Sequence, residues 1–419
     1  MINFRLLKNS DMALWICAGL LILIGFLSIY SSTFAMLSRK AALAAGAGID
    51  PLLFVKRHFV SFLMGAAGLC FFCYMDYNNL KKAAWPLYGL MLFLLLIVLA
   101  AGFESYGAQR WLGIGPFSFQ PSEISKLILI IALAKYFEDK KGIRHITELV
   151  PAVLIMGLPF LLIFKQPDLG TALVFIAITV GMIIWVQDNP MILLLMATPI
   201  MSALLSFHLS IWAIFFIITA GLLLFGKARI QEWIAILGAN VLTVLAVPFI
   251  WGMLRDYQKQ RLVTFLDPSA DPFGAGYHTI QSLIAIGSGG LFGRGFLMGT
   301  QTQLQFIPQQ WTDFIFSVIG EEFGFVGAMV VIILFGVMIW RAMHIAMNAG
   351  DFYGSILAVG IAFMMLFHFG INIAMTLGIA PVVGIPLPFI SFGGTSLIIN
   401  MCAIGILQSI AMRREKLFF

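Results

Sequence analysis

The chain has 419 residues, of which 61% are hydrophobic and 11% charged, and its formal net charge is +6. A soluble globular protein needs more polar residues on its surface, so this composition excludes that class and predicts a polytopic membrane protein. The basic residues lie in segments between hydrophobic runs, as in membrane proteins generally, so the positive charge does not indicate binding to nucleic acid.

Hydrophobic runs recur along the whole chain and predict an all-α bundle in a single domain, residues 1–419. A membrane-spanning helix needs about 20 apolar residues, and about 17 are enough for the shortest. On this criterion we expect about 10 to 12 membrane-spanning helices and one large extracytoplasmic loop, residues 252–313. The expected spans are 13–36, 59–75, 85–102, 124–137, 149–164, 170–186, 191–207, 211–226, 231–252, 314–340, 352–377 and 395–411.

The distribution of Lys and Arg predicts that both termini are cytoplasmic, because short cytoplasmic loops are enriched in these residues. Positive charge also occurs in the longer outer segments 37–58, 103–123 and 252–313, where an anionic ligand on the outer face would account for it. The inner residues in this orientation are Arg5, Lys8, Lys81, Lys82, Lys140, Lys141, Arg144, Lys227, Arg229, Arg341, Arg413, Arg414 and Lys416. The N-terminal hydrophobic run has no small-residue cleavage site and is expected to be a span.

Glycine and proline interrupt the sequence GAQRWLGIGPF, so we expect a folded loop there rather than a helix. Trp111 should lie at the membrane interface, where aromatic residues are enriched, and Arg110 should point toward the outer headgroups. The next helix is expected to begin at Gln120-Pro121, because proline is favoured in the first turn.

Glu123 and Lys126 are three residues apart and therefore share one face at the outer end of that helix. Two interpretations stay open: an ion pair that anchors the helix end, or part of a functional site. Asp168, in KQPDLGTA, also falls at the outer boundary, where it is either part of a structural turn or neutralised by Lys126 or Lys165. The apolar sequence of residues 191–226 predicts a pair of helices, and we identify no candidate functional residues in it.

In the large loop, Arg255, Lys259 and Arg261 form a cationic collar just outside the membrane. The glycine cluster IGSGGLFGRG matches neither the G-x-G-x-x-G nor the G-K-[ST] nucleotide motif. Its glycines are expected to permit a close approach of backbones or to form an anion-binding nest.

Asp313 immediately precedes an expected span and is followed by Phe314, Ile315 and Phe316. Apolar surroundings disfavour the charged form of a carboxyl group, which would make Asp313 a usable base or acid near neutral pH. The alternative is that it caps the following helix. About two turns deeper, at least one of the adjacent residues Glu321 and Glu322 must face the interior.

Residues 378–396, GIAPVVGIPLPFISFGGTS, interrupt the last hydrophobic region with prolines and glycines. Irregular backbone at membrane depth is tolerated only where it is buried in protein or lines a watery cavity. We therefore expect this segment to form one wall of the site, with Ser391 and Thr395 as its polar members.

Taken together, these motifs resemble the SEDS family (shape, elongation, division and sporulation), and GTQTQLQFIP and DYQKQR are more similar to its RodA branch than to FtsW. The resemblance extends over nearly the whole chain and includes GAQRWLGIGPFSFQPSEISK, KQPDLGTA, RLVTFLDPSADPFGAGYHTIQSLIAIGSGG and PVVGIPLPFISFGGTS. Family members usually have ten spans, so residues 191–226 would be an additional pair.

The resemblance implies a peptidoglycan glycosyltransferase of the bacterial cytoplasmic membrane, which polymerises lipid II at the outer face during cell elongation. It also implies a class B penicillin-binding protein and other elongation proteins as partners. The essential carboxylate of the family falls on Asp313, the expected general base, which would deprotonate the acceptor hydroxyl. The expected substrate-binding residues are Arg110, Trp111, Lys126, Asp168, Arg57, Arg261 and Ser391.

Cations among these residues would stabilise the departing pyrophosphate, and a divalent ion, Mg or Mn, could share that task although no ligand cluster is evident. Two other hypotheses stay open: a lipid II flippase, and a noncatalytic scaffold for a partner synthase. A flippase should need a polar path through the cytoplasmic half, and few charges are expected there.

Overall fold

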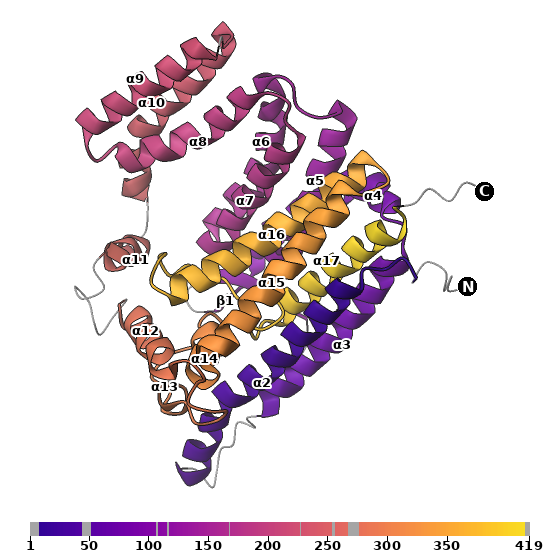
Figure 1. Ribbon diagram of the computed structural model, residues 1–419, viewed down its shortest axis with the longest axis vertical. Coiled ribbons are helices and arrows are strands. Elements are labelled where there is room, and N and C mark those ends of the chain that lie inside the picture. The colour runs from indigo at the N-terminus through magenta and orange to yellow at the C-terminus, as the bar shows by residue number, and fades with distance from the viewer. Residues whose placement is uncertain are drawn as a thin grey trace.

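The computed structural model is a bundle of long helices (Figure 1). It describes residues 8–43, 52–105, 108–114, 117–166, 168–226, 228–253, 256–266 and 276–414. Within these ranges nine helices are long and apolar enough to cross a membrane. They are contained in α2 (Met12–Leu43), α3 (Leu52–Tyr74), α4 (Asn78–Ala101), α6 (Leu149–Lys165), α7 (Leu169–Val186), α10 (Ile230–Met253), α15 (Gly324–Met347), α16 (Phe352–Thr376) and α17 (Gly394–Met412). The prediction of an all-α multi-pass membrane protein is confirmed.

Three further helices occupy the other expected spans. The helix α5 (Pro121–Lys140) begins with proline in its first turn, as predicted, but carries several charged residues. The helices α8 (Pro190–Leu205) and α9 (Leu209–Phe225) are apolar but shorter.

The core of the bundle lies around α17, which is buried along almost its whole length. This helix packs against α3, while α16 packs against α15, α7 and α5. Both α5 and α16 are also buried over most of their residues. The central helices therefore meet other helices on several sides, whereas few residues of α8, α9 and α10 are buried.

The segment after α4 is not helical, as predicted, but the expected folded loop contains a small antiparallel sheet that the sequence did not predict. Strands β1 (Phe103–Ser105), β2 (Ala108–Ile114) and β3 (Phe117–Phe119) pair in this order, with Leu112 opposite Phe119. The aromatic residues in these short runs favour extended structure, and pairing the strands satisfies backbone groups that water would not reach near a membrane.

The single span expected at 314–340 is wrong, because the helix breaks. The short helix α14 (Ile315–Glu322) is followed by its C-cap residue Phe323, and α15 begins at Gly324, whose φ is 65°. Only glycine adopts this left-handed conformation without strain, and a Cβ at Gly324 would lie 2.3 Å from the backbone nitrogen of Gly293. The break therefore makes room for the glycine cluster of the large loop.

The large loop contains the helices α11 (Asp256–Leu266), α12 (Tyr277–Gly289) and α13 (Thr300–Gln303). A Cβ at Gly289 would lie 2.0 Å from the carbonyl oxygen of Gly320, so α12 and α14 approach each other more closely than any larger residue permits. This confirms the prediction that these glycines permit close backbone approach. Arg255, one of the expected collar residues, lies outside the described residues.

Residues 191–226 form the expected helix pair, which lies with α10 at one side of the bundle (Figure 1). A buried polar network holds these three helices together. The Ser202 hydroxyl donates to Asn240 Oδ1 (2.6 Å), Asn240 Nδ2 donates to Thr198 Oγ1 (3.0 Å), and Trp212 Nε1 donates to Ser202 Oγ (3.1 Å). Each polar group finds a partner where lipid would offer none.

Both Glu321 and Glu322 are buried, which confirms the prediction that at least one of them faces the interior of the bundle. The Glu321 carboxylate accepts hydrogen bonds from the backbone N–H groups of Gln301 (2.8 Å) and Thr302 (2.9 Å) and from the Thr302 hydroxyl (2.7 Å). The Glu322 carboxylate accepts from the Ser31 hydroxyl of α2. The two acids thus join the end of the large loop to the bundle.

We expect Glu321→Gln to lower the free energy of unfolding by about 1–3 kcal/mol, because the new amide N–H group would face donors and leave them unpaired. Glu322→Gln is the matched control, since an amide oxygen still accepts from Ser31. Thermal unfolding of the purified protein in detergent measures both changes. Equal stability of the two variants would contradict this account of Glu321.

Candidate functional site

Asp313 lies in the turn that precedes α14, and the backbone of this turn is held at three consecutive carbonyl groups. Phe392 N–H donates to the carbonyl oxygen of Trp311 (2.8 Å), the Ser391 hydroxyl donates to that of Thr312 (2.6 Å), and Asn372 Nδ2 donates to that of Asp313 (2.9 Å). We call these three hydrogen bonds the carbonyl clamp. The donors come from the end of α16 and from the irregular segment before α17, so distant parts of the chain fix the turn.

The irregular segment 378–393 supplies two of the three donors, Ser391 and Phe392, because proline and glycine keep it from forming a helix. Its residue Gly384 has a φ of 72°, and a Cβ there would lie 3.3 Å from Asp313 Oδ2. The carboxylate of Asp313 is therefore next to this backbone. The segment borders Asp313, which supports the expectation that it forms one wall of the site.

Ser391 is held by the backbone on both sides. Its hydroxyl donates to Thr312 and accepts from the backbone N–H of Leu387 (2.8 Å). These contacts give Ser391 a structural role in the carbonyl clamp, and its direct contact with a substrate stays a prediction. Thr395, the other polar residue expected in this wall, accepts from Gln120 N–H (3.4 Å) at the start of α5.

Asn372 was not identified from the sequence. Its Nδ2 also donates to the carbonyl oxygen of Ile385 (2.7 Å), and because both partners are carbonyl acceptors, the orientation of the amide is fixed. The side chain is fully buried, and its Oδ1 has no hydrogen-bond partner in the described part of the chain. The available signal was a lone amide inside a long apolar helix, which is costly and therefore informative.

Lys126 lies almost fully buried between two partners. Its Nζ is 2.7 Å from Glu123 Oε1 and 2.9 Å from His368 Nε2, and the side chain of Lys126 is 2% exposed. His368 Nδ1 is 2.7 Å from the carbonyl oxygen of Met364, so Nδ1 carries the hydrogen and Nε2 accepts from the ammonium. The ion pair expected from the sequence is confirmed, and the sequence did not identify His368.

Asp168 caps the start of α7. Its carboxylate accepts from the Thr171 backbone N–H (3.3 Å), the Thr171 hydroxyl (2.9 Å) and Gln120 Nε2 (3.1 Å). These contacts fix the turn at the start of α7, while the ammonium of Lys126 is engaged by Glu123 and His368, and neutralisation of Asp168 by Lys165 stays a prediction. Through Gln120, Asp168 also joins α7 to the start of α5.

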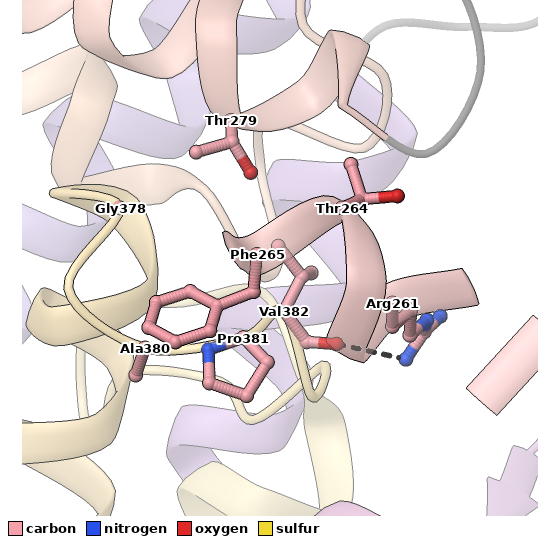
Figure 2. A pocket seen from close by; sticks show the side chains of 8 residues that line it. All are labelled: Arg261, Thr264, Phe265, Thr279, Gly378, Ala380, Pro381 and Val382. Carbon is pink, nitrogen blue, oxygen red and sulfur yellow. Dashed lines mark hydrogen bonds between the residues drawn. The ribbon is translucent and has the colours of Figure 1, made fainter. Parts of the chain in front are cut away.

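Arg261 lies on α11, and its Nη1 donates to the carbonyl oxygen of Val382 (3.0 Å), as Figure 2 shows. Thr264 and Phe265 of α11 face Gly378 and Pro381 across a small cavity (Figure 2). The large loop therefore packs on the same irregular segment that borders Asp313.

His278, on α12, stacks on Phe314, the residue after Asp313, with ring centroids 5.9 Å apart. Burial of the ring, together with the nearby charge of Arg261, lowers the pKa of His278 below its ordinary value. The neutral imidazole is therefore favoured beside Phe314. Phe314 is also the N-cap residue of α14, so the expected alternative, Asp313 as this cap, is not what the helix boundary shows.

The other expected site residues lie at the same end of the helix bundle as Asp313. Trp111 lies half-buried in β2 and pairs with Phe103, whereas the side chain of Arg110 lies outside the described residues. Arg57 is exposed on α3, one turn from Phe54, whose ring contacts those of Trp311 and Phe392. The start of α3 thus packs beside the carbonyl clamp.

All these residues lie at one end of the bundle, because α3, α5, α7, α14 and α17 begin there and α16 ends there. This end brings together a carboxylate, a buried ammonium and exposed arginines, which suits proton transfer next to an anionic group. Among the described residues, no group of three or more His, Cys, Asp or Glu side chains is arranged to hold a metal ion.

Comparison with known proteins gives a consistent match. The model of the family described as "Cell cycle protein", which covers FtsW, RodA and SpoVE, matches residues 11–210 and 186–416. The chain is 37% identical to peptidoglycan glycosyltransferase MrdB of Escherichia coli K12 over 79% of this chain and 78% of that protein. It is 36% identical to peptidoglycan glycosyltransferase RodA of Treponema pallidum, over 81% and 85% of the two chains.

Solved structures show the same fold. A chain from a study of how a peptidoglycan synthase complex coordinates polymerization and crosslinking superposes with a TM-score of 0.71 at 28% identity, covering 97% of this chain and 99% of that one. The crystal structure of Thermus thermophilus RodA, 23% identical, superposes with a TM-score of 0.61 over 97% of this chain and 98% of that one.

We expect Gly384→Ala to destabilise the protein by about 1–2 kcal/mol, because a left-handed conformation is strained for alanine. Its new methyl group would also press on Asp313 Oδ2. The control is Gly336→Ala on α15, where a Cβ meets no atom within 4 Å and alanine is the better helix former. The midpoint temperature of thermal unfolding should fall for Gly384→Ala and stay level or rise for Gly336→Ala. The opposite order would contradict the left-handed backbone conformation assigned to Gly384.

Proposed function

Because this chain belongs to the family of FtsW, RodA and SpoVE, we propose that it is a peptidoglycan glycosyltransferase that polymerises lipid II, with Asp313 as its general base. The observation that carries the role of Asp313 is the carbonyl clamp, which fixes the backbone of the residue that bears the carboxylate. Relatives named as glycosyltransferases favour this activity over the lipid II flippase and the scaffold.

In the proposed reaction, a hydroxyl oxygen of the acceptor sugar attacks the anomeric carbon of the donor. The bond between that carbon and the lipid pyrophosphate oxygen breaks, and the pyrophosphate leaves with the bonding electrons. Asp313 accepts the proton of the attacking hydroxyl, which is a weak nucleophile until the proton is removed. A clamped backbone suits this task, since a general base must lie within hydrogen-bond reach of the proton.

Negative charge grows on the leaving pyrophosphate, and cations at this end of the bundle would stabilise it. Lys126 has three N–H donors, of which Glu123 and His368 engage two among the described residues, and the third would bind a phosphate oxygen. Arg57, Arg110 and Arg261 would bind the pyrophosphate from the surface. Trp111, Asp168 and Ser391 complete the proposed substrate-binding residues.

The proposed setting is the bacterial cytoplasmic membrane, with both termini cytoplasmic and the site at the outer face. In support, the start of α2 and the end of α17 lie at the same end of the bundle, because Asp11 N–H donates to Gln408 Oε1 (2.8 Å). The site lies at the other end. The proposed partner is a class B penicillin-binding protein, in keeping with a structural relative from a peptidoglycan synthase complex. Other elongation proteins stay a prediction.

A divalent ion, Mg or Mn, is also a proposal. Mg²⁺ commonly keeps several waters and binds largely through substrate phosphates, so the lipid pyrophosphate would hold it without a larger protein cluster. If so, EDTA should abolish polymerisation of lipid II by the purified protein, and added MgCl₂ or MnCl₂ should restore it. Full activity in EDTA would exclude this cofactor.

We expect Asp313→Asn to reduce polymerisation of lipid II by about 100-fold or more, because an amide cannot accept the proton of the acceptor hydroxyl. The matched control is Asp188→Asn, the same chemical change at an exposed carboxylate on the opposite end of the bundle. Glycan products resolved on gels, with and without a cognate penicillin-binding protein, measure both variants.

Two results would overturn the proposal. Full polymerisation by folded Asp313→Asn would exclude this carboxylate as the base. A wild-type protein that moves lipid II across vesicle membranes, yet makes no glycan even with its partner, would favour the flippase instead.

A further inference from the structure

One face of α16 contacts both halves of the proposed site. His368 and Asn372 are four residues apart, so they are neighbours on the same side of the helix, about 6 Å apart along its axis. His368 meets Lys126 on α5, and Asn372 meets the backbone of Asp313 before α14. This face of the helix therefore contacts both the ammonium and the turn that bears the carboxylate.

In the hydrogen bond between His368 and Lys126, the donor is the Lys126 ammonium and the acceptor is the imidazole. The Nδ1–H of His368 is committed to the Met364 carbonyl of its own helix, which leaves only the Nε2 lone pair for Lys126. With Glu123 on its other side, the ammonium is held from two helices rather than one. A flexible lysine side chain loses much of its freedom in this arrangement, which suits a fixed positive charge.

The contact with Asp313 is equally constrained. Asn372 donates both of its observed hydrogen bonds to backbone carbonyls, those of Asp313 and Ile385. It thereby ties the turn that carries the carboxylate to the irregular segment that borders it. The side chain is fully buried, so water does not replace either bond if the amide is removed.

We propose that His368 and Asn372 are positioning residues, and that this face of α16 sets the distance between the Lys126 ammonium and the Asp313 carboxylate. This inference rests on the proposed function of Lys126 and Asp313. Because the two residues belong to one rigid helix, movement of α16 would shift both reacting groups together. Neither residue itself touches the substrate in this proposal.

The test uses the full-length protein and separates kcat from KM in lipid II polymerisation. His368→Leu removes the acceptor for Lys126. Asn372→Leu removes both N–H donors without a change in charge, and Asn372→Asp removes them with the introduction of a carboxyl group. We expect kcat to fall about 10- to 100-fold in all three, since a displacement of about 1 Å can cost that much, while KM stays within about threefold. His368→Gln, which keeps an acceptor for Lys126, should retain most of the wild-type kcat.

Thr376→Val is the matched control, because Thr376 follows one turn later on the same face and its hydroxyl bonds only to the Ile373 carbonyl of its own helix among the described residues. Its kcat should stay within about threefold of wild type. Thermal unfolding of every variant is measured alongside, so that a loss of folded protein is not counted as a loss of rate.

The proposal is overturned if His368→Leu and Asn372→Leu match Thr376→Val in kcat, or if their loss of rate only follows the loss of folded protein. It is also overturned if His368→Gln is as slow as His368→Leu. These results leave the proposed function intact as long as wild type polymerises lipid II and Asp313→Asn does not. An inactive wild type, or an active Asp313→Asn, would instead refute the proposed function itself.

Discussion

The carbonyl clamp on Trp311, Thr312 and Asp313 is the constraint on which the candidate site depends. At membrane depth a backbone carbonyl without a donor is costly, and an irregular segment has N–H groups without helical partners. Here the irregular segment supplies the donors that the turn before α14 needs, since the Phe392 N–H group and the Ser391 hydroxyl donate to carbonyl oxygens of that turn. Neither the turn nor the segment would be stable alone, and their union places the Asp313 carboxylate beside Gly384.

Buried charges follow the same logic at two other places. Lys126 is held between an acid and a neutral imidazole, and Glu321 is surrounded by donors from the start of α13. A buried charge is tolerable only when its partners are fixed in advance. The first arrangement presents a positive charge near the proposed substrate, whereas the second fastens the large loop to the bundle. Similar chemistry therefore serves the proposed function in one case and architecture in the other.

The helices α8 and α9 stand apart from this organisation. They pack on each other and on α10 and are held by the Ser202–Asn240 network, but none of the candidate site residues lies on them. The pair therefore adds no residue to the candidate site, which lies elsewhere in the bundle.

Local sequence information was sufficient to predict much of the fold of this protein. Composition predicted the membrane bundle, the length of apolar runs predicted the membrane-spanning helices, and spacing alone predicted the Glu123–Lys126 pair, because helical neighbours are close whatever the tertiary structure. The resemblance to a family singled out Asp313. The sequence did not reveal the β-sheet after α4 or the break at Gly324, because both depend on backbone groups finding partners elsewhere.

The tertiary structure alone decided which polar residues act together. His368 and Lys126 are 242 positions apart, and Asn372 meets the Asp313 carbonyl across 59 positions, so no local pattern relates them. A lone histidine or asparagine in an apolar helix signals only that some partner must exist, since its burial would otherwise be too costly. The identity of that partner follows from how α5, α14 and α16 pack, which is a property of the folded bundle and not of any single segment.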